Sequence, residues 1–438
     1  MPYLLAGIHL CICLSFIFQY IKTPTPVFQY MGLLSVFSLG YYVLPFISME
    51  WSGLSHYVES DIVSAQLIHL IYFISLIFGV FSSLFYVRLT SNNNYTFQVP
   101  TIDNFISKNM AIVFWVCWAL YLIYFFTAEH TSYSSNSFED FFHKRSPIYS
   151  VIAFFSRYAQ AAMIIILAFN ISRGFNRQIY LQILAFVFTI LLLMGVGQRL
   201  ALITPLIMFF VSLGLFGNAK AANKVIVFTI IFLFIISPFS VYLRGAQSGE
   251  FDAVAKFSEY KAKDTGIESS VKSIVERGDL ILNTIHLKKF IDQDHYVGSE
   301  YYYSILVAPI PKIIYPNKPY LLSDDGTIWG EISVLAWRLM IGETTGSLTA
   351  FGGITAYRQG GWFALVVDGI FAGFLSVFFI TFLSQGGYFG KIVYITLFVS
   401  ICVKKVPPSF FESLTTFLPF VPILIVAKYL PMFFKREQ

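Results

Sequence analysis

Four arginine residues lie beside long apolar runs, where a guanidinium group is unusual and chemically useful. They are Arg199 in "GVGQRLALITP", Arg244 in "VYLRGAQ", Arg338 in "VLAWRLMIGE" and Arg358 in "GGITAYRQGGW". A guanidinium fork binds phosphate oxygens in a bidentate manner, and neighbouring glycines let backbone amides approach such a ligand. We therefore expect an anion site here. The alternatives are that these arginines mark membrane boundaries, or that Arg338 pairs with Glu343.

A second group of residues could transfer protons. The segment "SIVERGDLILNTIHLKKFI" has apolar residues at helical spacing, so we expect an amphipathic helix that lies on the membrane or on the helical bundle. Asp279 and His286 are seven residues apart and share one face of that helix. A carboxylate and an imidazole together suit a base and its orienting partner, although two polar residues on a solvated face are common. Arg277 adds a cation, and Glu343 is the remaining acidic candidate.

A proline-rich strap follows this helix. In "APIPKIIYPNKPY" the residues Pro309, Pro311, Pro316 and Pro319 exclude regular helix and sheet and predict an irregular backbone that presents Lys312 and Lys318. Upstream, "SEYYYS" supplies three tyrosines that suit sugar stacking but equally suit an interfacial aromatic belt. They are Tyr301, Tyr302 and Tyr303.

Other chemistries have no recognisable motif in the chain. It contains no phosphate-binding P-loop, serine elbow or HExxH pair, and its four cysteines lack the spacing of metal ligands. We expect no metal and no cofactor. A cluster of cations at a membrane suits a lipid diphosphate, which carries its own activated leaving group. The protein then needs cations for the departing diphosphate and one base for the attacking hydroxyl.

The elements that must position these residues are membrane helices. The chain is 57% hydrophobic and only 12% charged, against about 25% charged in soluble domains. A bilayer needs roughly 20 apolar residues per helix, which predicts an all-α polytopic protein with about eleven spans, within a range of roughly 10–12. The expected spans are residues 3–21, 27–47, 62–87, 109–127, 148–171, 179–196, 200–217, 225–243, 361–383, 388–403 and 413–434.

The spans divide the chain into three parts. Residues 1–243 form an N-terminal membrane bundle, residues 244–360 form one long polar loop, and residues 361–438 form the C-terminal spans. Lys and Arg of the short loops mostly fall on the cytoplasmic side if the long loop is outside. The net charge of +5 is then a topology signal and no evidence for nucleic acid. The acidic segment around Glu59 also falls outside.

Three stretches in one order resemble the O-antigen polymerases of the Wzy type. "GVGQRLALITP" is similar to the family's glycine-rich G-x-R turn, and "PIPKIIYPNKP" to its proline strap, where Lys312 replaces the usual arginine. "TAFGGITAYRQGGWFALVVDGIFAGFL" resembles the entry into the next span. The resemblance covers about residues 190–385 and otherwise only the span pattern.

The resemblance implies a GT-C-like membrane glycosyltransferase in the bacterial inner membrane, with the long loop in the periplasm. It would transfer the growing undecaprenyl-diphosphate-linked glycan onto a new lipid-linked repeat unit, with a chain-length regulator protein as a further expected partner. An O-antigen ligase shares the span pattern, but the ligase histidine motif does not fit the surroundings of His286 or His295. A flippase would carry charges within many spans and usually internal repeats.

Overall fold

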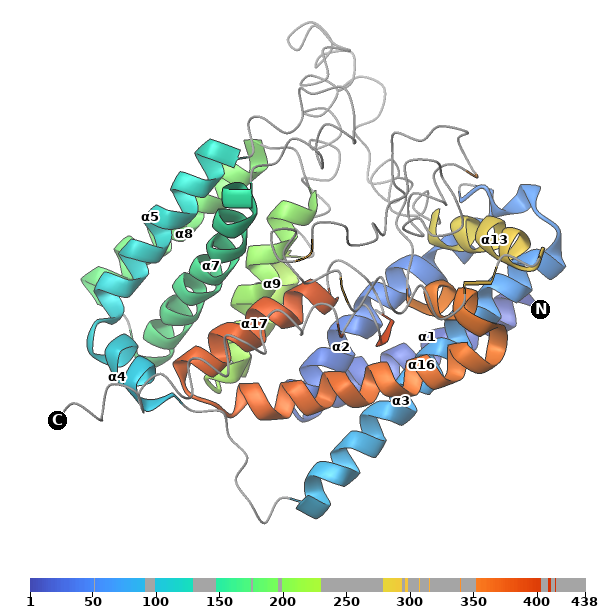
Figure 1. The fold of residues 1–438 in the computed structure, drawn as a ribbon, viewed down its shortest axis with the longest axis horizontal. Helices are drawn as coiled ribbons and strands as arrows, with labels where there is room; N and C mark the ends of the chain where they lie inside the picture. The colour runs from blue at the N-terminus through green and yellow to red at the C-terminus, as the bar shows by residue number, and fades with distance from the viewer. Residues whose placement is uncertain are drawn as a thin grey trace, which may run out of the picture. The chain divides into compact units, whose positions relative to one another are not determined.

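The structure of the protein is a computed structural model. The described residues are 1–50, 52–90, 99–128, 147–174, 176–195, 199–229, 279–293, 296–297, 352–402, 409–410 and the single positions Val307, Tyr315, Leu339 and Leu414. Within these ranges every regular element is a helix (Figure 1). The longer helices are α1 (Pro2–Lys22), α2 (Pro26–Ser38), α3 (Glu59–Thr90), α4 (Pro100–Lys108), α5 (Met110–Ala128), α7 (Pro147–Arg173), α8 (Arg177–Gly195), α9 (Arg199–Leu215), α13 (Asp279–Ile291), α16 (Gly352–Ser384) and α17 (Tyr388–Cys402).

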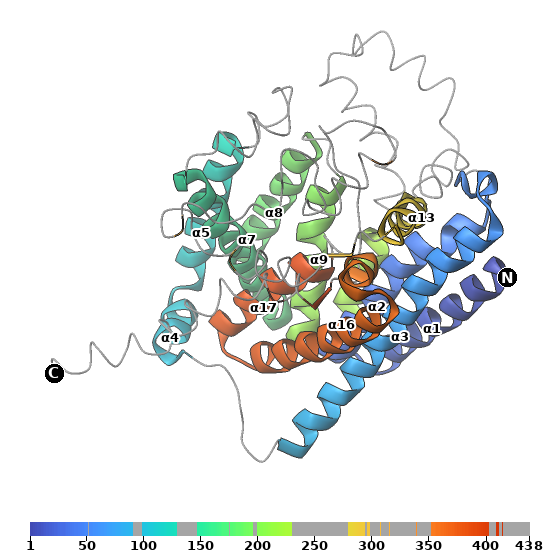
Figure 2. The ribbon, with the colours of Figure 1, turned by 45° about the vertical axis from the view of Figure 1, so that its right-hand side comes forward.

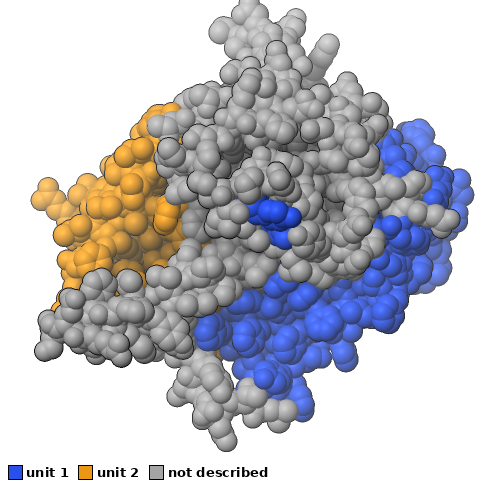
Figure 3. Space-filling view, viewed as in Figure 1, with its two compact units in different colours: residues 1–96, 275–382, 400–438 blue, residues 97–274, 383–399 orange. Residues whose placement is uncertain are grey.

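The helices belong to two compact units, which Figure 3 colours separately. Unit 1 combines residues 1–96, 275–382 and 400–438, and unit 2 combines residues 97–274 and 383–399. Each unit therefore joins segments that are far apart in the chain. The division expected from the sequence, at residues 243 and 360, follows chain order and stays a prediction.

Unit 1 is built on α1, α2, α3 and α16. Helix α1 packs against α2 and α3, and a π-helical turn, η1 (Leu39–Val43), continues α2 toward Pro45. The side chains of Met31, Leu34, Ile68 and Tyr72 are fully buried between these helices. Helix α13 lies against α3 and η1, close to the end at which α3 begins (Figures 1 and 2).

Glycines allow α3 and α16 to pack with their backbones in contact. A Cβ atom at Gly79 would lie 2.0 Å from the carbonyl oxygen of Ile370, and one at Gly373 would lie 2.1 Å from that of Leu76. Gly369 faces Ser75 in the same way, so small residues four apart line both helices. Such small-residue stripes are how membrane helices approach closely when the surrounding lipid is as apolar as their side chains.

A buried carboxylate strengthens the same pair of helices. Asp368 of α16 is buried, and its Oδ1 accepts hydrogen bonds from the hydroxyl of Tyr72 at 2.9 Å and from the backbone N–H of Phe410 at 2.8 Å. A carboxylate within an apolar span needs such partners, because unpaired burial is costly. Asp368 therefore links α3, α16 and the segment at residue 410.

Other helices of unit 2 pack around α7. Residues 161–168 of α7 are all buried, and α7 packs against α5, α8 and α9 (Figure 1). Helices α4 and α5 meet at a bend of 93°. Asp103 of α4 accepts the backbone N–H of Phe389 at 2.9 Å, so its negative charge lies at the N-terminus of α17, where the helix dipole favours it.

The helices agree with a polytopic membrane protein. Within the described residues, five helices are long and apolar enough to cross a membrane, or up to six if α4 and α5 form one broken span. Shorter apolar helices at 177–193, 203–215 and 388–398 coincide with further predicted spans. The predicted spans at 225–243 and 413–434 lie largely outside the described residues. The count of eleven stays a prediction.

Candidate functional site

Helix α13 gathers titratable groups of unit 1. Its apolar side chains Leu280, Ile281, Ile285, Leu287 and Ile291 are buried, and four titratable residues lie toward its C-terminal end. They are His286, Lys288 and Lys289, followed by Asp292 just after the helix ends at Ile291. The amphipathic helix expected from the sequence is thus confirmed from Asp279 to Ile291. We call these four residues and their partners Tyr57, Asp61 and Tyr357 the α13 site.

His286 is hydrogen-bonded to a tyrosine from a loop that is far away in the sequence. Its Nε2 and the hydroxyl of Tyr57 are hydrogen-bonded at 2.8 Å, and the two rings are perpendicular with centroids 5.6 Å apart. Tyr57 follows a 3-10 turn, η3 (Leu54–His56), that starts after Gly53 in the left-handed conformation at φ 71°. This turn, which favours glycine, places the phenol over α13.

The surroundings of His286 favour its neutral form. Partial burial, and then the positive charge of Lys289, lower the pKa of His286 below its usual value of 6.5. A neutral imidazole has a lone pair that can accept a proton near neutral pH. His286 is therefore our candidate for the general base.

The two lysines of the α13 site are already paired with carboxylates. Nζ of Lys289 lies 2.6 Å from Oδ2 of Asp61 on α3, and Lys288 forms an ion pair with Asp292 one helical turn later. Two positive and two negative charges compensate each other. This part of the site therefore offers hydrogen-bonding groups without the excess positive charge that a diphosphate requires.

The first turns of α16 complete the site. The hydroxyl of Tyr357 donates to Oδ1 of Asp292 at 2.9 Å. Gly360 and Gly361 depart from helical geometry, with φ 66° at Gly361, so residues 352–359 are separated from the longer apolar segment that follows. The sequence predicted a span from residue 361, and the break lies at that boundary. It lets Tyr357 point toward α13.

A buried polar contact fixes α13 on the bundle. The hydroxyl of Thr284 donates to the carbonyl of Leu280 at 2.6 Å, so Nε2–H of His69 donates to the Thr284 oxygen at 3.1 Å. The ring of Tyr42 lies 4.0 Å from that of His69 and 5.6 Å from that of His9. Ionisable side chains inside membrane helices are rare and usually have a role. His69, through its contact with Thr284, positions the helix that carries His286.

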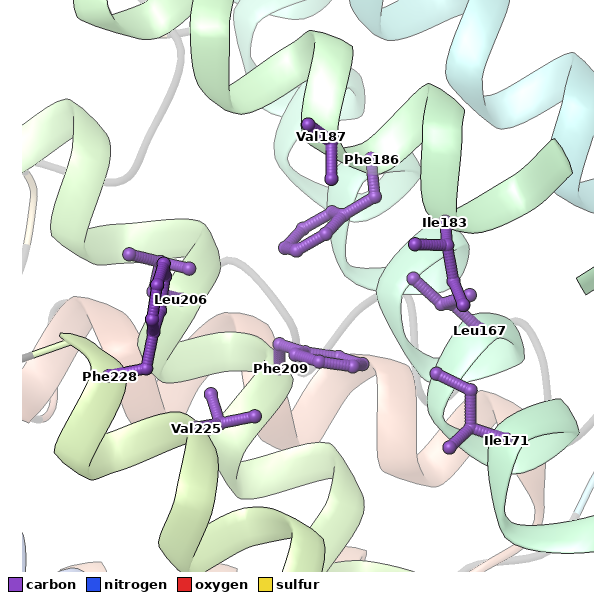
Figure 4. Close-up of a pocket in the computed structure, with 9 residues that line it drawn as sticks. All are labelled: Leu167, Ile171, Ile183, Phe186, Val187, Leu206, Phe209, Val225 and Phe228. Carbon is purple, nitrogen blue, oxygen red and sulfur yellow. The ribbon is translucent and has the colours of Figure 1, made fainter. Parts of the chain in front are cut away.

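A separate, apolar pocket lies within unit 2. It has a volume of about 250 Å³ and is bounded by α7, α8, α9 and the helix at residues 219–229 (Figure 4). Its lining is entirely aliphatic and aromatic, with Phe186, Phe209 and Phe228 pointing into it. It carries no group for acid–base chemistry. No metal-binding group of three or more His, Cys, Asp or Glu residues occurs within the described ranges.

Comparison with known families decides the class of protein. The family model described as O-antigen polysaccharide polymerase Wzy matches residues 2–260, which is more than half of the chain. The chain belongs to the Wzy family. No curated protein and no solved structure matches it. The match ends before α13, so it overlaps the motif resemblance of residues 190–385 only in part, and the two support the family from different segments.

The candidate residues of this Wzy family member are described to different extents. His286 has the partners given above, and Arg358 of α16 is buried, with only 1% of its surface exposed. Asp279 and Arg199 begin α13 and α9, but their side chains are not among the described ones. The remaining candidates lie outside the described residues: Arg244, Arg277, Tyr301, Tyr302, Tyr303, Lys312, Lys318, Arg338 and Glu343. Their roles stay predictions.

Several residues of the α13 site were not recognised from the sequence. Tyr57 and Tyr357 carry no motif that distinguishes them from interfacial tyrosines. The i,i+4 spacing of Lys288 and Asp292 in "KKFID" is a signal from which their ion pair could have been predicted. Asp368 was detectable as a lone acid within an apolar run.

Proposed function

We propose that this protein polymerises undecaprenyl-diphosphate-linked oligosaccharide repeat units at the periplasmic face of the inner membrane. Membership of the Wzy family supports polymerisation of O-antigen repeats in general. The hydrogen bond between His286 and Tyr57, on a helix beside the apolar spans, carries the assignment of the base. The fold is of the GT-C-like helical type in this proposal, and the long loop that contains α13 faces the periplasm.

The reaction joins an acceptor hydroxyl to the anomeric carbon of the growing chain. In this mechanism the imidazole of His286 carries its proton on Nε2, which donates to the Tyr57 oxygen, and Nδ1 accepts the proton of the acceptor hydroxyl. The hydroxyl oxygen forms a bond to the anomeric carbon while the bond from that carbon to the diphosphate oxygen breaks. The electron pair leaves with undecaprenyl diphosphate. Asp279 and Glu343 are the alternative bases.

Cations stabilise the departing diphosphate. Lys288 and Lys289 are paired with carboxylates. We therefore assign diphosphate binding to the other cationic candidates: Arg199, Arg244, Arg277, Lys312, Lys318, Arg338 and Arg358. Guanidinium forks suit this role because they match two phosphate oxygens at once. The tyrosines at 301–303 contribute to sugar binding, and a chain-length regulator acts as partner.

A deletion strain that carries single variants tests this proposal. Loss of His286 in His286→Ala, or of a diphosphate contact in Arg199→Ala, lowers the polymerisation rate by roughly 10²–10³-fold. Lipopolysaccharide gels are then expected to show core capped with single repeat units and no long chains. Arg199→Lys keeps the charge but loses the fork, so it stays well below wild type.

The same gels distinguish the rival functions. Single repeats show that export and ligation still work when polymerisation fails. Bare core with no repeat would instead indicate a ligase, and lipid-linked units retained on the cytoplasmic side would indicate a flippase. Ladders of normal length from well-expressed His286→Ala protein would contradict the assignment of the base, and normal ladders from Arg199→Ala would contradict the diphosphate contact.

A further inference from the structure

Two partly exposed aromatic side chains lie near Asp292, which follows the C-terminal end of α13. Tyr296 is 42% exposed and Trp362 is 41% exposed. Both contact buried Tyr357, whose ring centroid lies 6.3 Å from that of Tyr296 and 5.3 Å from that of Trp362. The backbone N–H of Val297 donates to the carbonyl of Arg358 at 2.9 Å, which anchors Tyr296 on the first part of α16.

Polar groups lie at the edge of these rings. Asp292 accepts the Tyr357 hydroxyl and pairs with Lys288, whose Nζ lies 5.8 Å from the centroid of the Tyr357 ring. Tyr296 places its hydroxyl near Gly361, where a Cβ atom would lie 3.7 Å from it. Two partly exposed aromatic rings, a carboxylate and an ammonium thus surround Tyr357.

We propose that Trp362, Tyr296, Asp292 and Lys288 form a subsite for the sugar rings of the acceptor glycan. The flat apolar face of a pyranose packs on an aromatic ring, and its hydroxyls donate to a carboxylate and accept from an ammonium. The balanced charge of the Lys288–Asp292 pair suits hydroxyl groups better than a diphosphate. This subsite rests on the proposed function and assigns the described part of the α13 site to the acceptor.

The placement of the subsite along α13 fits that assignment. Around the helix axis Lys289 lies between Asp292 and His286, and Asp292 comes six positions after His286, about 9 Å along the axis. A glycan held at Trp362 has to extend over that length to reach the imidazole of His286. Sugar rings that bind beside Trp362 then present a hydroxyl group to His286.

Binding of a lipid-free glycan tests the subsite without catalysis. The probe is the repeat-unit oligosaccharide, released by mild acid from the lipid-linked pool of the cells that carry this gene. The full-length protein is held in nanodiscs, because a sugar-based detergent would compete. Wild type is expected to bind the probe saturably, and Trp362→Ala to bind it about tenfold more weakly. Trp362→Phe, which keeps a ring, should recover most of the affinity.

A matched tryptophan provides the control. Trp115 on α5 is 37% exposed, lies within a predicted span and takes no part in the subsite. Trp115→Ala is expected to bind the glycan like wild type. Equal binding by Trp362→Ala and Trp115→Ala would overturn the subsite and make Trp362 an interfacial membrane anchor. Absence of saturable binding to the wild type would overturn it as well.

Two further measurements separate this inference from the proposed function. His286→Ala should keep glycan binding, because the base is not needed to hold the sugar. Inorganic pyrophosphate should not displace the probe; displacement would place the diphosphate here and overturn the acceptor assignment. If Trp362→Ala binds normally while His286→Ala still gives single repeats in cells, the subsite fails and the polymerase function stands.

Discussion

At the scale of single residues, the α13 site is a neutral imidazole among compensated charges. His286 is bounded by the Tyr57 hydroxyl and by Lys289, and Lys289 in turn is neutralised by Asp61. Lys288 forms its pair with Asp292 at the C-terminal end of α13. Because pairs at partly exposed positions contribute only about 0–1 kcal/mol to stability, their chief effect is on proton affinity and on recognition. This makes the pH dependence of the reaction a direct measure of the site.

The first prediction concerns the acidic limb of the pH–rate profile. A base works only when deprotonated, and the pKa of His286 is lowered from its usual value of 6.5, first by burial and then by Lys289. Polymerisation by reconstituted protein should therefore persist into mildly acidic buffer. Lys289→Gln removes a charge that lowers this pKa, so the pKa rises and the acidic limb moves to higher pH.

Lys288→Gln is the control for this shift. Lys288 belongs to the pair with Asp292, and Lys289 is the charge that lowers the pKa of His286. The acidic limb should keep its position in Lys288→Gln even if glycan affinity falls. An acidic limb that stays in place in Lys289→Gln would argue against His286 as the titrating base.

At the scale of elements, the contact of α3 with α16 sets the platform for the site. Helix α3 carries Asp61 and His69, which bind α13, and α16 carries Tyr357 and Trp362. The two helices hold these groups in register through Gly79, Gly369 and Gly373. A loss of this close packing would therefore affect His286 and the sugar subsite together.

The second prediction tests that contact. In Gly79→Ala the new Cβ meets backbone atoms of Ile370, which cannot rotate away as a side chain would. We expect a loss of about 1–3 kcal/mol, typical of overpacking, seen as a lower melting temperature of the solubilised protein. Gly7→Ala is the control, because no atom lies within 4 Å of a Cβ at that position. It should be neutral or stabilising by about 1 kcal/mol; equal melting of both variants would contradict the close approach.

At the scale of the whole molecule, the proposed function depends on which side of the membrane the long loop faces. The lipid-linked glycan and its acceptor meet in the periplasm in our proposal, so α13 and the strap must lie there. The distribution of Lys and Arg over the short loops predicts this orientation.

The third prediction maps this orientation with introduced cysteines. A cysteine at Ser258 or Ser323 should react with a membrane-impermeant thiol reagent in cells whose outer membrane has been permeabilised. A cysteine at Asn218, in the turn after α9, should stay unlabelled until the inner membrane is opened. The reverse pattern would invert the topology and remove α13 from the periplasm.

Much of the helical framework was determined by the sequence alone. The apolar runs at residues 3–21, 62–87 and 179–196 coincide with α1, α3 and α8, because a membrane helix must be apolar along its whole length. The spacing of apolar residues after Arg277 predicted α13, since one buried stripe is enough to define an amphipathic helix. The same reasoning identified His286 as a candidate base.

Only the tertiary structure decided what surrounds His286. Its partner Tyr57 is 229 residues away, and Asp292 meets a tyrosine 65 residues later in the chain. Hydropathy shows which face of a helix is buried but not which helix covers it. Hydropathy also did not single out Asp368, because one acidic residue hardly changes the mean hydropathy of a span. These contacts depend on where glycines allow α3 and α16 to meet, and that is a property of packed backbones in three dimensions.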